Sequence, residues 1–122
     1  MFLTDLALTD FRSYHQVIVK LGQGVTTFVG ENGQGKTNWL EAIAVLASTR
    51  SFRTARLLDA VNFGSDTAMV RGDVRESPEI VRELRIIIAG NTKTLLINDK
   101  KETVNRYLGQ LHAVVFNSDE LE

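Results

Sequence analysis

The sequence predicts a mixed α/β fold built around one glycine-rich loop that joins a strand to a helix. Two observations predict it. Residues 30–37 read GENGQGKT and fit the pattern G-x-x-x-x-G-K-[ST]. Residues 68–97 form short alternating runs with turn residues between them, which is typical of antiparallel strands rather than of repeated strand–helix units.

Three strands are predicted before the loop. Residues 1–11 alternate weakly, and residues 12–14 form the far end of that strand or a turn. Residues 17–21 form a second strand, and a Gly-Gln-Gly turn leads into a third, β-branched strand over residues 25–29. Because strands joined this tightly pair side by side, the first two should form an antiparallel ribbon.

A helix is predicted directly after the loop. Beyond Thr37, apolar residues recur at helical spacing on one face: Leu40, Ile43, Ala44 and Ala47. Residues 50–56 are polar and basic with one aromatic, and residues 57–61 form a short helix.

The rest of the chain is predicted to be a meander. Alternation indicates strands over residues 68–74, 80–89 and 94–97, with Pro78 and Gly90 in the intervening turns. The final elements are a turn over residues 98–101, a short helix over residues 104–111 and a buried apolar strand over residues 113–116.

The glycine-rich loop predicts a phosphate site. Glycines let successive backbone N–H groups point at phosphate oxygens, and the following helix directs its positive end at the same anion. The lysine of the pattern reaches the β- and γ-phosphates, and the hydroxyl after it binds Mg²⁺. We therefore predict that ATP and Mg²⁺ bind here, with Thr37 as the metal ligand. The predicted nucleotide-binding residues are Gly30, Glu31, Asn32, Gly33, Gln34, Gly35, Lys36 and Thr37.

Composition sets limits on the class of protein. The 122 residues amount to one domain or a piece of one, and the formal net charge of −1 argues against a basic, non-specific nucleic-acid binder. No apolar run approaches the roughly 20 residues that span a bilayer, and cysteine is absent. We expect a cytoplasmic protein without a membrane partner.

Several stretches together resemble the N-terminal head of the RecF family of bacterial DNA replication and repair ATPases. They are LTDFRSY at residues 8–14, FVGENGQGKTN at 28–38, LEAI at 40–43, RSFR at 50–53 and VFNSDELE at 115–122. The resemblance implies a P-loop NTPase of the ABC/SMC-head type. It also implies that residues 1–122 are the first lobe of that head, without its second lobe.

The resemblance implies a function as well. Family members bind ATP and DNA, at single-stranded regions and gaps, and form ATP-dependent homodimers. They work with RecO and RecR proteins in recombinational repair, replication restart and the SOS response. The parent protein would be a weak DNA-dependent ATPase. We expect this chain alone to lack a catalytic residue, because Asp119 and Glu120 do not directly follow an apolar strand as a catalytic carboxylate should.

Four arginines are further candidates. The resemblance places Arg12 near the nucleotide, although the residues themselves fit a surface arginine beside a turn equally well. Arg50, Arg53 and Arg56 form a candidate patch for phosphate, either of nucleotide or of DNA. The alternative is a solvated loop with Phe52 packed into the core.

Two other functions remain open from the sequence. A P-loop phosphotransferase would need a regular parallel sheet, which the alternating runs over residues 68–97 argue against. The second of these functions is a non-enzymatic scaffold whose nucleotide site is idle.

Overall fold

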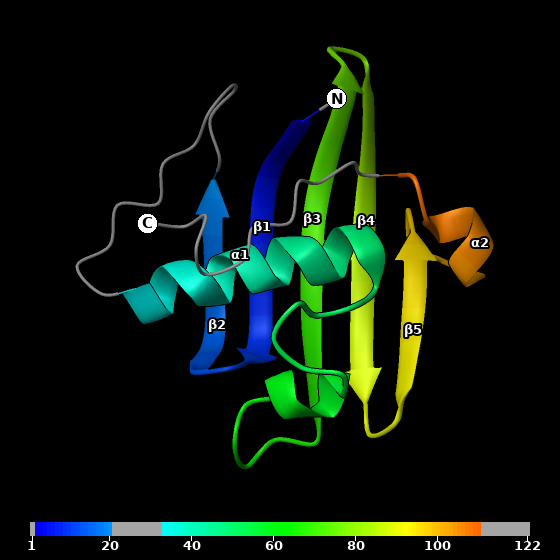
Figure 1. Ribbon diagram of the computed structural model, residues 1–122. Coiled ribbons are helices and arrows are strands. Elements are labelled where there is room, and N and C mark those ends of the chain that lie inside the picture. Colours follow the sequence, from blue (N-terminus) through cyan, green and yellow to red (C-terminus); the bar gives the residue numbers. More distant parts are fainter. Residues whose placement is uncertain (1, 21–32, 111–122) are drawn as a thin grey trace.

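The computed structural model describes residues 2–20 and 33–110 of the chain. In this part, one antiparallel sheet has the strand order β2-β1-β3-β4-β5-β6, and helix α1 crosses one face of it (Figure 1). The elements are β1 (Phe2–Phe11), β2 (Tyr14–Lys20), α1 (Gly33–Ser48), the 3₁₀ helix η1 (Leu57–Ala60), β3 (Thr67–Ser77), β4 (Ile80–Ala89), β5 (Thr92–Ile97), β6 (Lys100–Glu102) and α2 (Val104–Tyr107).

The predicted antiparallel ribbon is confirmed. β1 and β2 pair in antiparallel register from Asp5 opposite Lys20 to Phe11 opposite Tyr14. The turn between them is tight, so β2 starts three residues earlier than residue 17, where the sequence predicts it. On its other side β1 pairs with β3, which lies far along the chain.

The meander from β3 to β5 is confirmed, and the structure extends it by one strand. Asn98 and Asp99 both have positive φ, as the two central residues of a tight hairpin turn require. The chain therefore turns within two residues, and β6 pairs with β5 where the sequence predicts only a turn over residues 98–101. The predicted helix over residues 104–111 ends at Tyr107, since the next residue has extended dihedral angles.

The core lies between the sheet and α1. Strand residues that point toward the helix are fully buried, among them Leu6, Val70 and Ile86. Gly72 of β3 lies directly under the helix, because a Cβ atom there would come within 2.6 Å of the side chain of Leu46. This glycine therefore permits the close approach of helix and sheet.

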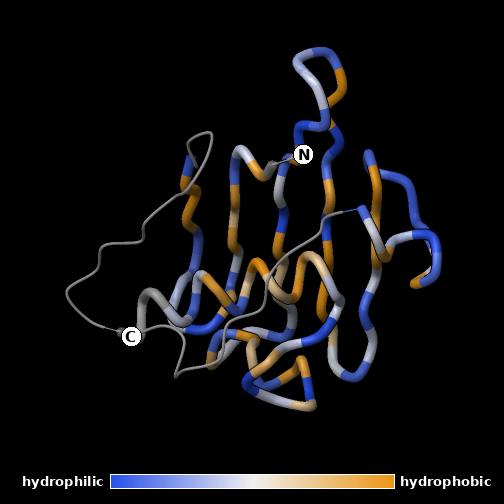
Figure 2. The backbone as a smooth tube through the Cα atoms, turned by 45° about the horizontal axis from the view of Figure 1, so that its top comes forward, coloured by the Kyte–Doolittle hydropathy of each residue, from blue (hydrophilic) through white to orange (hydrophobic). Residues whose placement is uncertain are grey.

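The buried surface of α1 is wider than the sequence predicts. Leu40 and Ile43, two members of the predicted apolar stripe, are only partly buried. The most deeply buried apolar positions are Ala42, Val45 and Leu46. Figure 2 shows hydrophobic segments both on the helix and on the strands of the sheet. Most of the helix circumference is covered, so a single-stripe interpretation of the sequence is incomplete.

Some predictions fall outside the described residues. They are the strands over residues 25–29 and 113–116, the turn over residues 22–24, and Asp119 and Glu120. No helix in the described part of the chain is long and apolar enough to cross a membrane.

Candidate functional site

The C-terminal half of the glycine-rich loop belongs to α1. Gly33, Gln34, Gly35 and Lys36 form the first turn of this helix, and Thr37 follows with a half-buried side chain. Gly30, Glu31 and Asn32 lie outside the described residues. A helix that begins within the motif presents its N–H groups and positive dipole end to an anion, as a phosphate loop requires. ATP contact by this loop and Mg²⁺ binding by Thr37 stay predictions.

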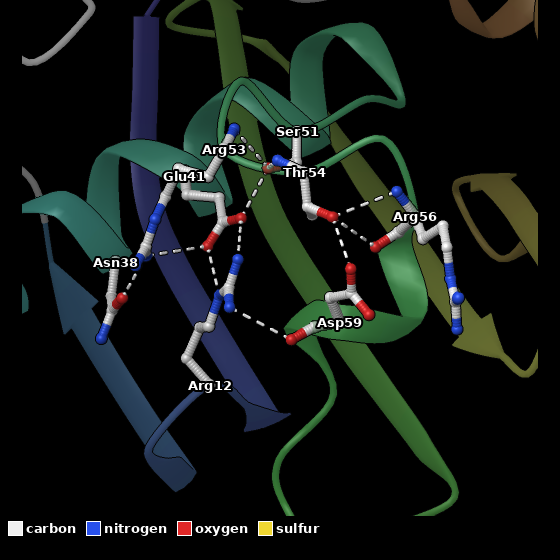
Figure 3. A network of polar contacts seen from close by, with 8 residues as sticks. All are labelled: Arg12, Asn38, Glu41, Ser51, Arg53, Thr54, Arg56 and Asp59. Atoms are coloured by element: carbon white, nitrogen blue, oxygen red, sulfur yellow. Dashed lines mark hydrogen bonds and ion pairs between the residues drawn. The ribbon is translucent and has the colours of Figure 1, made fainter.

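A buried carboxylate, Glu41, lies about one turn beyond Thr37 on the same helix. Glu41 has no exposed side-chain surface, and three side chains from two other segments bind it (Figure 3). Arg12 donates from Nε to Oε1 at 2.8 Å and from Nη2 to Oε2 at 2.7 Å. Ser51 Oγ donates to Oε2 at 2.6 Å, and Arg53 Nη1 lies 3.3 Å from Oε1. A buried carboxylate requires such partners, because desolvation of an unpaired charge is costly.

Arg12 is held in place by its backbone as well as its side chain. Its N–H donates to the carbonyl of Ala60 at 2.6 Å, and its carbonyl accepts from Asn62 Nδ2 at 2.5 Å. The third guanidinium nitrogen, Nη1, donates to the carbonyl of Asp59 at 3.1 Å. Arg12 also has a φ of 51°, which is unusual for a residue with a side chain. The β1–β2 turn is thus held in the one geometry that directs this guanidinium to Glu41.

Arg53 brings the loop after α1 to the same place. Besides its contact with Glu41, its Nη1 donates to Asn38 Oδ1 at 2.6 Å. Asn38 is buried and directly follows Thr37, the predicted Mg²⁺ ligand. The Glu41 cluster, defined as Arg12, Asn38, Glu41, Ser51 and Arg53, therefore joins two segments, the β1–β2 turn and the loop after α1, to the helix that carries the predicted phosphate loop.

The cluster fixes the ionisation of its central carboxylate. Burial alone would raise the pKa of Glu41, but hydrogen bonds from Arg12 and Ser51 and the charges of Arg12 and Arg53 outweigh it and lower the pKa. The hydrogen bond to Glu41 likewise raises the pKa of Arg12, against the effect of burial. Two guanidinium groups then face one carboxylate, so the five residues of the cluster carry a net charge of +1, with Asp59 as a further negative charge near Arg12.

The predicted arginine patch divides into two parts. All three arginines are exposed, but only Arg53 forms an ion pair with Glu41 and so joins Arg12 in the Glu41 cluster. In Figure 3 the side chain of Arg56 extends away from Glu41. Phe52, which the alternative reading packs into the core, is only half buried. Contact of these arginines with phosphate stays a prediction.

Sequence reasoning did not identify the role of Glu41. One signal was present, since an acid interrupts the apolar positions of the helix between Leu40 and Ala42. Trp39, two residues before Glu41, is buried, and its ring centroid lies 5.4 Å from that of Tyr14.

Comparison with known proteins finds relatives that match almost the whole chain. The RecF/RecN/SMC N terminal domain family matches residues 2–121. The DNA replication and repair protein RecF of Lactobacillus acidophilus is 37% identical over 123 residues, covering all of this chain and 32% of that protein. RecF of Acidothermus cellulolyticus is 41% identical over 122 residues, covering 99% of this chain and 33% of that protein. The chain thus spans about a third of the length of the curated relatives it matches.

Solved structures give the same result. RecF-ATP and RecF-ATPrS, structures of the recombination mediator protein RecF in the RecFOR pathway, each match with a TM-score of 0.86 and 29% identity. The RecF-ATP match covers 97% of this chain and 33% of that chain. The fold predicted from the sequence motifs, part of an ABC/SMC-type head, is therefore confirmed. The chain belongs to the RecF/RecN/SMC N-terminal domain family.

Proposed function

We propose that this chain is the ATP-binding first lobe of a RecF-like DNA replication and repair protein. The observation that carries the proposal is the convergence of three of the RecF-like segments at Glu41. Arg12 comes from LTDFRSY, Glu41 from LEAI, and Ser51 and Arg53 from RSFR. Segments separated by up to 29 residues from Glu41 thus meet on the helix that begins with the phosphate loop.

In this proposal Mg·ATP binds to residues 30–37, with Lys36 on the β- and γ-phosphates and Thr37 on the metal. Arg53 contacts Asn38, the residue after Thr37, so the positive charge of the Glu41 cluster lies close to this part of the helix. An anion bound at the loop would be stabilised by this charge as well as by the helix dipole.

The proposal includes the parent protein. The relatives are about three times as long as this chain, and we infer that their further length supplies the second lobe and the catalytic carboxylate. The intact protein would dimerise with ATP on DNA in the cytoplasm and act with RecO and RecR proteins. Hydrolysis by this chain alone would be slow, because loss of one positioning group costs about 10²–10³-fold.

The test is nucleotide binding by the intact protein and by its Lys36→Ala variant, measured by calorimetry with Mg²⁺ present. We expect Lys36→Ala to weaken Mg·ATP binding by about tenfold or more, because it removes the charge at the β/γ-phosphates. Lys100→Ala is the matched control, since it removes an exposed lysine on β6. Equal affinities for Lys36→Ala and Lys100→Ala would reject the proposed site.

A further inference from the structure

A basic groove lies between the loop that follows α1 and the β4–β5 turn. One cavity of about 430 Å³ includes Arg50 and Lys93 in its lining, and an adjoining one of about 240 Å³ includes Arg56 and Lys93. The two cavities share Ala55, Leu57 and Lys93, so they form one continuous depression. Figure 1 shows the loop and the β4–β5 turn at the same end of the sheet.

The residues that line this groove include three cations, Arg50, Arg56 and Lys93, while the carboxylate of Asp59 lies outside the lining and accepts a hydrogen bond from Thr54. No carboxylate lines either cavity. By contrast, Arg12 forms an ion pair with Glu41 and Arg82 forms one with Glu76. Within residues 2–20 and 33–110, no ion pair involves Arg50 or Arg56. A depression lined by charges of one sign concentrates the potential and attracts a polyanion.

Lys93 is fixed at the centre of the groove. Its Nζ donates to the carbonyl of Thr49 at 3.1 Å and to the Thr49 hydroxyl at 3.3 Å, at the C-terminal end of α1. An ammonium has three donors, so these two bonds leave one for a ligand. The lysine therefore stabilises the helix terminus and at the same time presents its charge to the groove.

The lining favours a nucleic-acid backbone. Contacts to phosphate and sugar come from Arg and Lys, from hydroxyl and amide side chains and from backbone N–H groups, and all these groups line the two cavities. No aromatic side chain lines either cavity, so the groove offers no platform on which a base could stack.

We propose that the groove lined by Arg50, Arg56 and Lys93 binds the phosphate backbone of DNA without reading its sequence. The inference rests on the proposed function, because it assigns a DNA contact to this lobe. It differs from the single patch predicted from the sequence, since it excludes Arg53, which is engaged by Glu41, and adds Lys93.

The test compares two double variants of the intact protein that lose the same charge. Arg50→Gln with Arg56→Gln removes two exposed cations of the groove, and Lys100→Gln with Lys101→Gln removes two exposed cations of β6. Binding of a fluorescein-labelled DNA duplex is followed by anisotropy across a salt series. Circular dichroism on both variants verifies the fold.

We expect the groove variant to reduce the magnitude of the negative slope of log K against log[salt] by about 2, because each lost phosphate contact contributes about 0.9. Its affinity should fall roughly 10- to 100-fold at low salt and converge with wild type at high salt. The β6 variant should match wild type, and duplexes of different sequence should bind alike.

Equal slopes for the two double variants would overturn the inference, and so would a strong sequence preference that the groove variant abolishes. A groove variant with a normal DNA slope and weakened Mg·ATP binding would overturn it in favour of a nucleotide site. If the wild-type protein binds Mg·ATP and DNA while the groove variant behaves like the β6 variant, only this inference fails. If the wild-type protein binds neither Mg·ATP nor DNA, both this inference and the proposed function fail.

Discussion

The carboxylate of Glu41 and the guanidinium of Arg12 form a bidentate ion pair, with N–O distances of 2.8 and 2.7 Å. This pair connects the turn after β1 to the helix that carries the phosphate loop. Glu41 is fully buried, while the Arg12 side chain keeps 21% of its surface exposed. The pair therefore determines where the β1–β2 turn lies relative to the helix.

Glu41→Gln should destabilise the fold by about 3 kcal/mol, because two partly buried guanidinium groups lose their shared countercharge. Urea unfolding at neutral pH measures the change. Glu76→Gln is the control, since Glu76 forms an ion pair with Arg82 but its side chain is 47% exposed. That substitution should cost no more than about 1 kcal/mol. Similar losses for the two variants would contradict the central role of Glu41.

The difference in unfolding free energy between wild type and Glu41→Gln should depend on pH, because the pKa of Glu41 is lowered in the folded state. A carboxylate whose pKa is lower in the folded state contributes stability that is complete above its unfolded pKa of about 4.3. That stability is lost as the pH falls through the folded value. The gap in unfolding free energy between wild type and Glu41→Gln should therefore narrow below about pH 4.3. Urea unfolding at a series of acidic pH values measures the gap.

The pKa of another carboxylate, Asp73, shifts in the opposite direction, so its effect on stability must be distinguished from that of Glu41. Burial raises the pKa of Asp73, so its contribution favours the folded state as the pH falls. Because both proteins contain Asp73, its effect cancels in the difference between them. A gap that widens on acidification would show that Glu41 is not the group whose ionisation matters.

Tyr107→Phe should destabilise the protein by about 1–2 kcal/mol. The buried Tyr107 hydroxyl donates to the carbonyl of Leu46 at 2.6 Å, in the last turn of α1, where carbonyls lack partners within the helix. The substitution removes this bond while keeping the ring, and thermal unfolding measures the loss. Tyr14→Phe is the control, because Tyr14 packs by its ring against Trp39. If both variants unfold alike, the bond to Leu46 does not hold α2 to α1.

The sequence predicted the local features of this protein. The glycine spacing of residues 30–37 predicts a phosphate loop, and the helix predicted after Thr37 is present, although it begins four residues earlier, at Gly33 within the motif. Alternation over residues 68–97 predicted three strands, because a half-buried sheet requires a period of two. The short strand β6 was missed, since three charged residues at a sheet edge carry no apolar signal.

Only the tertiary structure determined what these elements do together. β1 lies between β2 and β3, and α1 crosses the sheet over Gly72, so residues distant in sequence become neighbours. Glu41 thereby gains Arg12, 29 residues before it, and Arg53, 12 residues after it. The same packing leaves Arg50 and Arg56 beside Lys93. No local periodicity encodes these pairings, because a buried charge is stabilised by whichever opposite charge the fold brings within hydrogen-bonding distance.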